Sequence, residues 1–232
     1  MSAVDLRVDW CSYQAAKYAV EHWHYSRTMP SAFARLACIG VWENLQFIGA
    51  VVFSHGSNRN IGSPYGLSIY ECSECVRIAM KRHQSPVTQV LARSIKMVKN
   101  MSPGVRLLVS YADTEQDHTG TIYQASNWFY VGLTSAGNQY LLNGKKWHKE
   151  ALWASFGTNN SNALGAKIVP GSQKHKYLYP LDRAMRRQIA PLAQPYPKKL
   201  DTPPVNGDNP ATSQAGRFDS DPEALITGKL NG

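Results

Sequence analysis

The sequence contains no apolar run as long as a membrane-spanning helix requires. Such a helix needs about 20 consecutive apolar residues, and polar or charged residues interrupt every apolar stretch of this chain. The first residues, MSAVDLRVDW, carry Asp5 and Asp9 and no apolar block, so they do not resemble a secretory signal peptide. Hydrophobic residues make up 43% of the chain, enough to form a core. We therefore expect a globular protein that is neither inserted in a membrane nor exported.

Cysteine is scarce, with four residues at positions 11, 38, 72 and 75. They form no regular framework, which is typical of a protein from a reducing compartment. Cys72 and Cys75 have the spacing of half a zinc knuckle, but such a site needs a second pair and the chain has none. In a strand the two side chains would also face opposite sides of the sheet. The cysteines therefore favour neither a disulfide nor a zinc site.

Acidic residues are also scarce, with 16 Asp and Glu against 25 Lys and Arg, for a net charge of +9. Residues 201–232 hold five acids against Arg217 and Lys229, a charge of −3, which leaves +12 on residues 1–200. Because 201–232 is rich in Pro, Gly, Asn and Ser, we expect a single folded domain over 1–200 and a disordered tail after it. A basic domain is typical of proteins with a polyanionic partner, most often nucleic acid. A basic protein without such a partner is the alternative.

Apolar periodicity predicts a domain in which helices and strands alternate. A helix is expected over 12–24 with Ser12 as its N-cap, and two apolar runs joined by Glu43-Asn44-Leu45 predict a hairpin. A second helix is expected over 85–100, with Ser85 as N-cap and Pro86 at the first helical position. The other expected elements are strands over 70–80, 105–113 and 129–136, a short helix over 120–128 and a hairpin at Asn143-Gly144. This order predicts an α/β or α+β domain around a mixed sheet.

Several motifs resemble, in composition and in order, the phage Mom family of DNA-modifying proteins. They are HWHYSR (22–27), IGSPYGL (61–67), ECVR (74–77), SYAD with the following H-x-G-x-IYQA-x-NW (110–128), NGKKWHK (143–149), FGT (156–158) and KHKYLYPLD (174–182). The resemblance covers residues 12–199. The element order also resembles the GNAT fold. Together these resemblances imply a GNAT-like (acyl-CoA N-acyltransferase-like) α/β fold, with a central mixed, mostly antiparallel sheet flanked by helices.

The resemblance to the Mom family also implies a function. Members of that family convert adenines in double-stranded phage DNA to N6-carbamoylmethyladenine, which protects the DNA from host restriction endonucleases. The resemblance thus implies a transferase that acts on DNA in the host cytoplasm. Two alternatives remain open: a GNAT-like acetyltransferase acting on protein or a small molecule, and a basic DNA-binding protein without enzymatic activity. A monomer and a homodimer are both compatible with the sequence.

The chemistry of adenine modification indicates which residue types the site needs. The lone pair of adenine N6 is delocalised into the ring, so N6 must be aimed at an electrophile and must lose a proton. In a duplex the base must first be flipped out and stacked. Aromatic rings and an acid or an imidazole suit these tasks. The matched motifs supply such residues, and the predicted catalytic set is His24, Tyr25, Ser110, Asp113 and Tyr123.

The same residues also have structural interpretations. Trp23 and Tyr25 would be core aromatics and His24 a helix-capping residue, Asp113 would open an Asx turn, and Tyr123 would be a core aromatic. Under the resemblance, His24 and Asp113 are in addition candidate ligands of a mononuclear iron. No compact ligand motif accompanies them.

The loop over residues 81–86 bears on the group donor. In typical GNAT enzymes this loop is rich in glycine, and its N–H groups hold the pyrophosphate of coenzyme A at a helix N-terminus. Here the loop reads KRHQSP, without glycine. Acetyl-CoA and a glycyl donor such as an aminoacyl-tRNA are therefore both open. The predicted donor-binding residues are Arg77, Arg82 and Ser85, and the alternative for Arg77 is a salt bridge to Glu74 or Asp113.

Two segments, 143–150 and 174–199, interleave basic and aromatic residues. Such segments suit contacts with DNA phosphates, and the alternative is a solvated helix face. The predicted DNA-binding residues are Lys145, Lys146, Lys149, Lys174, Lys176, Arg183, Arg186 and Arg187.

Overall fold

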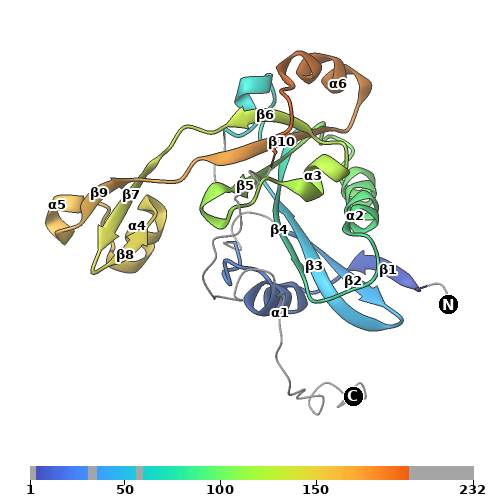
Figure 1. Cartoon of the computed structure of the whole chain (residues 1–232), viewed down its shortest axis with the longest axis horizontal. Coiled ribbons are helices and arrows are strands. Elements are labelled where there is room, and N and C mark those ends of the chain that lie inside the picture. Colours follow the sequence, from blue (N-terminus) through green and yellow to red (C-terminus); the bar gives the residue numbers. More distant parts are fainter. Residues whose placement is uncertain (1–3, 31–35, 56–59, 199–232) are drawn as a thin grey trace, which may run out of the picture.

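The computed structural model describes residues 4–30, 36–55 and 60–198, and the predicted tail over 201–232 lies outside them. The described chain forms a seven-stranded sheet, a smaller three-stranded sheet, and helices around both (Figure 1). The strands are β1 (Leu6–Trp10), β2 (Ala37–Glu43), β3 (Gln46–Ser54), β4 (Cys72–Met80), β5 (Leu107–Asp113), β6 (Phe129–Leu133), β7 (Asn138–Leu142), β8 (Lys145–Trp147), β9 (Lys167–Pro170) and β10 (Lys174–Pro180). The helices are α1 (Tyr13–Trp23), α2 (Val87–Met101), α3 (Thr121–Ala125), α4 (Lys149–Phe156), α5 (Ser161–Leu164) and α6 (Arg183–Ile189), with short 3-10 turns η2 (Ser63–Tyr65), η3 (Thr114–Gln116) and η4 (Ala190–Leu192).

Local sequence signals set several of these boundaries as predicted. The Ser12 side chain accepts the Ala15 N–H and so begins α1. Asn44 and Leu45 both have positive φ angles, 48° and 70°, the backbone that a tight β2–β3 hairpin requires. Asn143 and Gly144 repeat this pattern in the β7–β8 hairpin, with φ angles of 52° and 74°.

The prediction for the start of α2 is wrong by one residue. Pro86 is the N-cap, no side chain caps the helix, and Val87 is its first residue. The Ser85 N–H instead donates to the carboxylate of Glu43, 2.5 Å away, so Ser85 belongs to the loop before the helix. The buried face of α2 holds Val90, Leu91, Ile95 and Val98, as the apolar spacing predicts.

The large sheet has the strand order β1-β2-β3-β4-β5-β10-β6. Within it, β4 and β5 form the parallel pair, and the other described neighbours are antiparallel. The pairing of β4 with β5 runs only from Cys72 opposite Leu107 to Glu74 opposite Val109. Beyond Glu74 each strand continues without the other, so the sheet opens between them. This mixed, mostly antiparallel sheet flanked by helices confirms the predicted GNAT-like fold.

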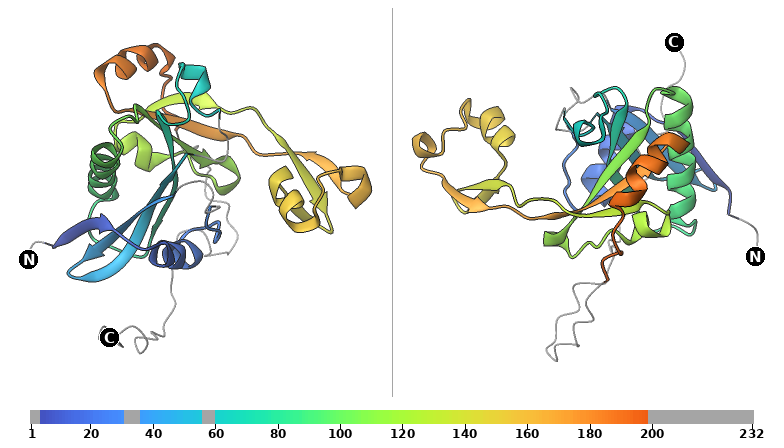
Figure 2. Two further views of the ribbon diagram at one scale, coloured as in Figure 1. Left: turned by 180° about the vertical axis from the view of Figure 1, so that it is seen from behind. Right: turned by 90° about the horizontal axis from the view of Figure 1, so that it is seen from above.

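Helices cover both faces of the large sheet. Val51 and Val52 are neighbours on β3 and so point to opposite faces. Val52 packs in a cluster with Ala16, Ala19 and Val20 of α1, while Val51 packs in the main core with Leu91 of α2. The two further views in Figure 2 show these layers from behind and from above.

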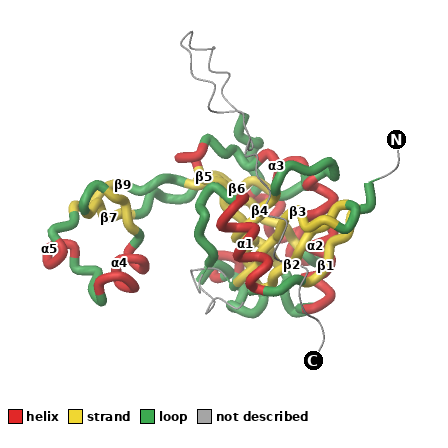
Figure 3. Tube along the Cα trace, turned by 90° about the horizontal axis from the view of Figure 1, so that it is seen from below, coloured by secondary structure: helices red, strands yellow, loops and turns green. Residues whose placement is uncertain are grey.

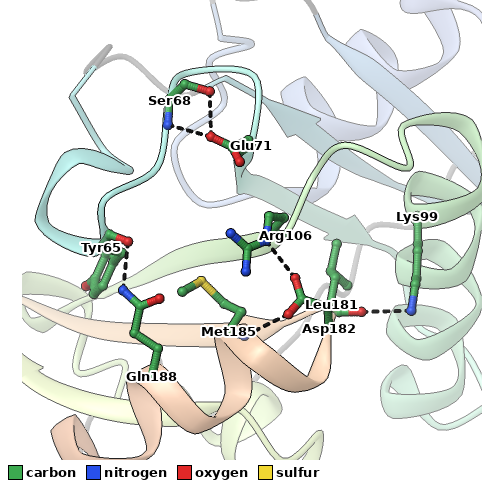
Figure 4. A network of polar contacts seen from close by, with 9 residues as sticks. All are labelled: Tyr65, Ser68, Glu71, Lys99, Arg106, Leu181, Asp182, Met185 and Gln188. Atoms are coloured by element: carbon green, nitrogen blue, oxygen red, sulfur yellow. Dashed lines mark hydrogen bonds and ion pairs between the residues drawn. The ribbon is translucent and has the colours of Figure 1, made fainter.

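The segment predicted as a basic, aromatic surface over 174–199 divides into two parts. Its first part is β10, an interior strand between β5 and β6, with Tyr177 and Leu178 fully buried. Its second part is α6, which Asp182 begins by accepting the Met185 N–H. Arg106 donates to the same carboxylate at 2.8 Å, and Lys99 donates to the Leu181 carbonyl at 2.7 Å (Figure 4). These contacts hold α6 at the C-terminal end of β10, directly after Pro180.

Residues 138–170, here called the arm, extend away from the large sheet (Figures 1 and 3). The arm contains the three-stranded sheet β8-β7-β9 and helices α4 and α5. It leaves the body after β6 and returns into β10. Leu152 is fully buried in it, whereas Trp153, Phe156 and Ile168 are exposed. The Lys146 ammonium lies 2.8 Å from the Glu115 carboxylate of η3, which ties the arm to the body.

Among the described helices, none is long and apolar enough to span a membrane.

Candidate active site

A cavity of about 590 Å³ lies where β4 and β5 separate. The end of α1 contributes His24 and Tyr25 to its wall, and β4 contributes Arg77. The segment from Asp117 to Tyr123 lines the side next to β5. The structure therefore brings together three segments, HWHYSR, ECVR and H-x-G-x-IY, that lie far apart in the sequence.

The His24 imidazole is held in one tautomer by the turn that ends α1. The backbone N–H of Ser26 donates to His24 Nδ1 at 3.1 Å, and Ser26 Oγ lies 2.8 Å from the same nitrogen. Because a backbone N–H can only donate, Nδ1 is unprotonated and the proton of the neutral ring resides on Nε2. Burial, followed by the positive charges of Arg77 and His118, lowers the pKa of His24 to about 4. At neutral pH His24 is thus an uncharged hydrogen-bond donor in the cavity wall.

Tyr25 and His118 extend this wall with two more rings. The Tyr25 ring lies 4.3 Å from the His24 ring, and the His118 ring meets Tyr25 edge-on at 5.2 Å. Tyr25 is 50% exposed, so it is not the core aromatic of the structural interpretation. Burial and the charge of Asp113 raise the pKa of Tyr25. Its hydroxyl is therefore protonated at neutral pH, and the residue is half-exposed in the cavity wall.

His118 was not among the predicted site residues. The signal available was its place in the matched segment SYAD-x-x-x-x-H, five residues after Asp113. Its backbone N–H donates to the Asp113 carbonyl at 3.2 Å, which turns the chain back toward the cavity. Only the folding of this loop against the turn after α1 places His118 beside Tyr25.

Arg77 uses its donors on the backbone. Its Nε and Nη2 donate to the Thr28 carbonyl at 3.1 and 3.0 Å, and Nη1 donates to the Val76 carbonyl at 2.7 Å. Within the described ranges it makes no salt bridge with Glu74 or Asp113, the alternative that the sequence left open. Burial lowers the pKa of Arg77. In this geometry Arg77 anchors the turn that carries His24 and Tyr25.

Ser110 and Tyr123 form a buried relay under the cavity. Ser110 is fully buried, and its Oγ lies 2.8 Å from the Cys75 carbonyl and 2.7 Å from the Tyr123 hydroxyl. Since the carbonyl can only accept, the Ser110 proton points to Cys75 and the Tyr123 proton points to Ser110. Burial strongly raises the pKa of Tyr123. The relay joins α3 to β4 through Ser110 of β5, and Tyr123 also lines the cavity.

Asp113 ends β5 and begins η3. One of its carboxylate oxygens accepts the Glu115 N–H at 3.0 Å, which is the Asx-type turn of the structural interpretation. Asp113 is not among the residues that line the cavity, although its neighbour Ala112 is, and its charge adds to the effect of burial in raising the pKa of Tyr25. The described residues contain no group of three or more His, Cys, Asp or Glu able to hold a metal ion, so His24 and Asp113 gain no third ligand there.

The predicted donor-binding loop is closed by a carboxylate. The N–H groups of Gln84 and Ser85 both donate to Glu43, which is only 8% exposed. In the GNAT-like arrangement these N–H groups would hold the pyrophosphate of coenzyme A. The residues present do not fit that group, because both N–H groups already donate to a charged side chain. Arg82 lies beside Glu43 in a separate cavity of about 520 Å³.

The predicted DNA-binding residues fall into three groups. Lys145 and Lys149 are exposed on the arm, Lys145 above the Trp147 ring at 4.3 Å, and Lys146 is paired with Glu115. Lys174 and Lys176 are half-buried on β10, where Lys176 lies 4.9 Å from the Tyr65 ring and burial lowers its pKa. The exposed arginines Arg183, Arg186 and Arg187 lie on α6, beyond the opposite end of β10.

The fold and this cavity define a GNAT-like α/β protein whose candidate site lies between its two parallel strands. The sequence then specifies the family: the chain belongs to the Mom protein family, whose model matches residues 5–198. It is 24% identical over 207 residues to the methylcarbamoylase Mom of Escherichia phage Mu, with 84% of each chain covered.

Solved structures of acetyltransferases are similar at low identity. A putative acetyltransferase from Acinetobacter baylyi is 14% identical with a TM-score of 0.46, covering 78% of this chain and 95% of that one. A Bacillus subtilis acetyltransferase solved in complex with CoA is 11% identical with a TM-score of 0.46, covering 78% and 100%. The spermidine N-acetyltransferase of Vibrio cholerae is 9% identical with a TM-score of 0.48, covering 78% and 97%.

Proposed function

We propose that this protein is a transferase that converts adenine in double-stranded DNA to N6-carbamoylmethyladenine and so protects phage DNA from host restriction. Membership of the Mom family and the name of the phage Mu relative, a methylcarbamoylase, support the reaction. The observation that carries the proposal is the wall formed by His24, Tyr25 and His118. It combines a half-exposed aromatic face with an uncharged imidazole donor beside the gap between β4 and β5.

The residues of this wall suit the steps that the reaction requires. A flipped adenine would stack on the open face of Tyr25. In the product adenine N6 is bonded to the CH2 carbon of the carbamoylmethyl group, so N6 must lose a proton and the CH2 carbon must part from a leaving group of the donor. The amide carbonyl oxygen of the transferred group is a hydrogen-bond acceptor, and His24 Nε2–H would donate to it and orient the CH2 carbon toward N6. Because His24 is neutral and has its proton on Nε2, it serves as this hydrogen-bond donor rather than as the base. Asp113 remains the proposed acceptor of the proton that leaves adenine N6.

Ser110, Tyr123 and Arg77 support the site in this account. Ser110 is fully buried, so it acts by fixing the Tyr123 hydroxyl. Arg77 fixes the turn after α1 through the Thr28 carbonyl. These three are proposed as positioning residues, and Tyr123 has in addition one edge in the cavity.

The arm supports a duplex substrate. Its lysines Lys145 and Lys149 are exposed, and its contact through Lys146 is with η3, the turn that follows Asp113. The arm therefore extends positive charge outward from the side of the cavity. Phosphate contacts there would hold the duplex while one base enters the cavity.

The test is mass spectrometry of nucleosides from plasmid DNA of cells that express the chain, with Asp113→Asn as the paired variant. Asparagine can still accept the Glu115 N–H and keep the turn, but it cannot take up a proton at neutral pH. We expect an adenine derivative heavier by one carbamoylmethyl group with the wild type and its loss with Asp113→Asn. Unmodified DNA from well-expressed wild type would contradict the function. Full modification by Asp113→Asn would contradict only the role of Asp113.

A further inference from the structure

The N-terminus of α2 carries an unusual arrangement for a GNAT-like fold. The loop before it contains no glycine, and Pro86 at its end has no N–H to offer. The N–H of Gln84 lies 3.1 Å from both carboxylate oxygens of Glu43, and the N–H of Ser85 lies 2.5 Å from one of them. Two donors that could cradle an outside anion are thus used within the protein.

Glu43 is charged in this position. Burial acts to raise its pKa, but the hydrogen bonds from the Ser85 side chain and from the Ser85 and Gln84 N–H groups, with the charge of His83, hold the pKa below its ordinary value. A negative charge is therefore fixed at the positive end of the α2 dipole. A diphosphate brought to the same place would meet repulsion and would find both loop N–H groups occupied.

The backbone around Glu43 leaves little freedom to withdraw that carboxylate. Glu43 is the last residue of β2, paired with Leu6 of β1 and with Gln46 of β3. The Asn44 N–H donates to the Asp5 carbonyl at 2.9 Å, and the Asn44 side chain accepts the Asp5 N–H at 3.1 Å. The tight turn at Asn44-Leu45 is thus held from both sides, so removing Glu43 from the loop requires a rotation of its side chain out of three hydrogen bonds.

We infer that Glu43 determines donor specificity by occupying the helix terminus where a coenzyme A diphosphate would bind, so that the donor of this protein is not held by a diphosphate at α2. The inference concerns the donor of the proposed reaction and to that extent rests on the proposed function. Its test is a binding measurement that needs neither DNA nor turnover, so its failure and the failure of the proposed function are separate results.

The experiment is calorimetric titration of coenzyme A into the full chain and into Glu43→Gln and Glu43→Ala. The glutamine variant keeps the size of the side chain and removes its charge, and the alanine variant opens the loop. Glu21→Gln is the matched control, because it removes one negative charge from α1, where Glu21 faces Lys17 at 3.6 Å on the exposed surface. Circular dichroism before each titration establishes that the variant is folded.

We expect no saturable binding by the wild type or by Glu21→Gln, and binding by Glu43→Ala that inorganic pyrophosphate displaces. We expect Glu43→Ala to bind coenzyme A at least about tenfold more tightly than the weakest binding that the titration can detect. The reason is that the two loop N–H groups then become free. Wild-type binding as tight as that of the Glu43 variants would overturn the inference. The absence of binding by both Glu43 variants would overturn it as well, because Glu43 would then not be what excludes the coenzyme.

Discussion

At the residue scale, the chemistry of the site depends on the protonation state of His24, whose Nδ1 carries no hydrogen. Ser26 donates to Nδ1, so the neutral ring presents Nε2–H, and protonation would place a second hydrogen against the Ser26 N–H. Burial and the neighbouring Arg77 charge also disfavour protonation of the ring. The turn after α1 thus maintains an uncharged donor over the physiological pH range.

The depressed pKa of His24 predicts a pH dependence of stability. The ordinary pKa is 6.5 and the folded value is about 4, so between these values the unfolded chain binds a proton that the folded chain does not. The contribution is fully present above pH 6.5 and is lost as the pH falls toward 4. We expect the free energy of unfolding of the wild type to fall more steeply in this window than that of His24→Asn. The difference between the two slopes should correspond to the uptake of at most about one proton on unfolding. Urea unfolding of both proteins at several pH values measures this, and parallel curves would contradict the lowered pKa of His24.

Motif matching could identify part of the site but not which of its residues face the cavity. It named His24, Tyr25, Arg77 and Tyr123, which the structure places around one cavity. It could not distinguish the buried Ser110 from residues that face the cavity, because burial depends on the packing of α3 over β4 and β5. It also missed Glu43, whose partners Gln84 and Ser85 lie 41 and 42 residues away in the sequence.

At the element scale, local patterns predicted well wherever a turn or a cap is read from neighbouring residues. Ser12, Asn44-Leu45 and Asn143-Gly144 are of this kind. The strand β10 is different, because it inserts between β5 and β6 after the whole arm has intervened. Its basic residues Lys174 and Lys176 suggested a surface, whereas Tyr177 and Leu178 pack in the interior. Non-local strand order of this sort is not contained in any short window of sequence.

The contact between α3 and β10 predicts a sensitive position at Gly120. Its φ is +76°, and an added Cβ would lie 2.4 Å from the Tyr177 ring. Gly144 has a similar φ of +74° but open space around it, so Gly144→Ala is the matched control for backbone strain alone. We expect Gly144→Ala to cost about 1 kcal/mol and Gly120→Ala to cost at least about 2 kcal/mol more, as an overpacked core position does. Chemical denaturation measures both values, and equal losses would contradict the packing of Tyr177 against this turn.

At the scale of the whole molecule, the exposed residues among the predicted DNA-binding set lie on two elements, the arm and α6. The arm carries the exposed Lys145 and Lys149 and contacts η3 through Lys146, while α6 carries its arginines past the other end of β10. In the sequence these arginines lie in one segment with Lys174 and Lys176. Nothing in that segment indicates that Lys174 and Lys176 belong to an interior strand of the sheet. A duplex whose target base enters the cavity would therefore meet the arm first.

This arrangement predicts a difference in the salt dependence of DNA binding. We expect Lys145→Gln with Lys149→Gln to lower the slope of log K against log salt by about 2, since each phosphate contact contributes about 0.9. The matched double variant Arg183→Gln with Arg187→Gln should lower it less, because α6 lies away from the cavity. Fluorescence anisotropy with a labelled duplex over a series of salt concentrations gives both slopes. A larger effect of the α6 pair would place the duplex on the other side of the molecule.

The most direct measurement for the central claim compares two histidines of α1 and the turn after it. His24 lines the cavity, whereas His22 lies two residues earlier, on α1, with its Nδ1 at 2.8 Å from the Tyr18 carbonyl. Mass spectrometry would quantify modified adenine in plasmid DNA from cells expressing the wild type, His24→Ala or His22→Ala. Near wild-type modification is expected with His22→Ala, and a loss of about 100-fold with His24→Ala, the effect of misplacing a reacting group by about 1 Å. Wild-type modification by a folded His24→Ala protein would contradict the placement of the reaction in this cavity.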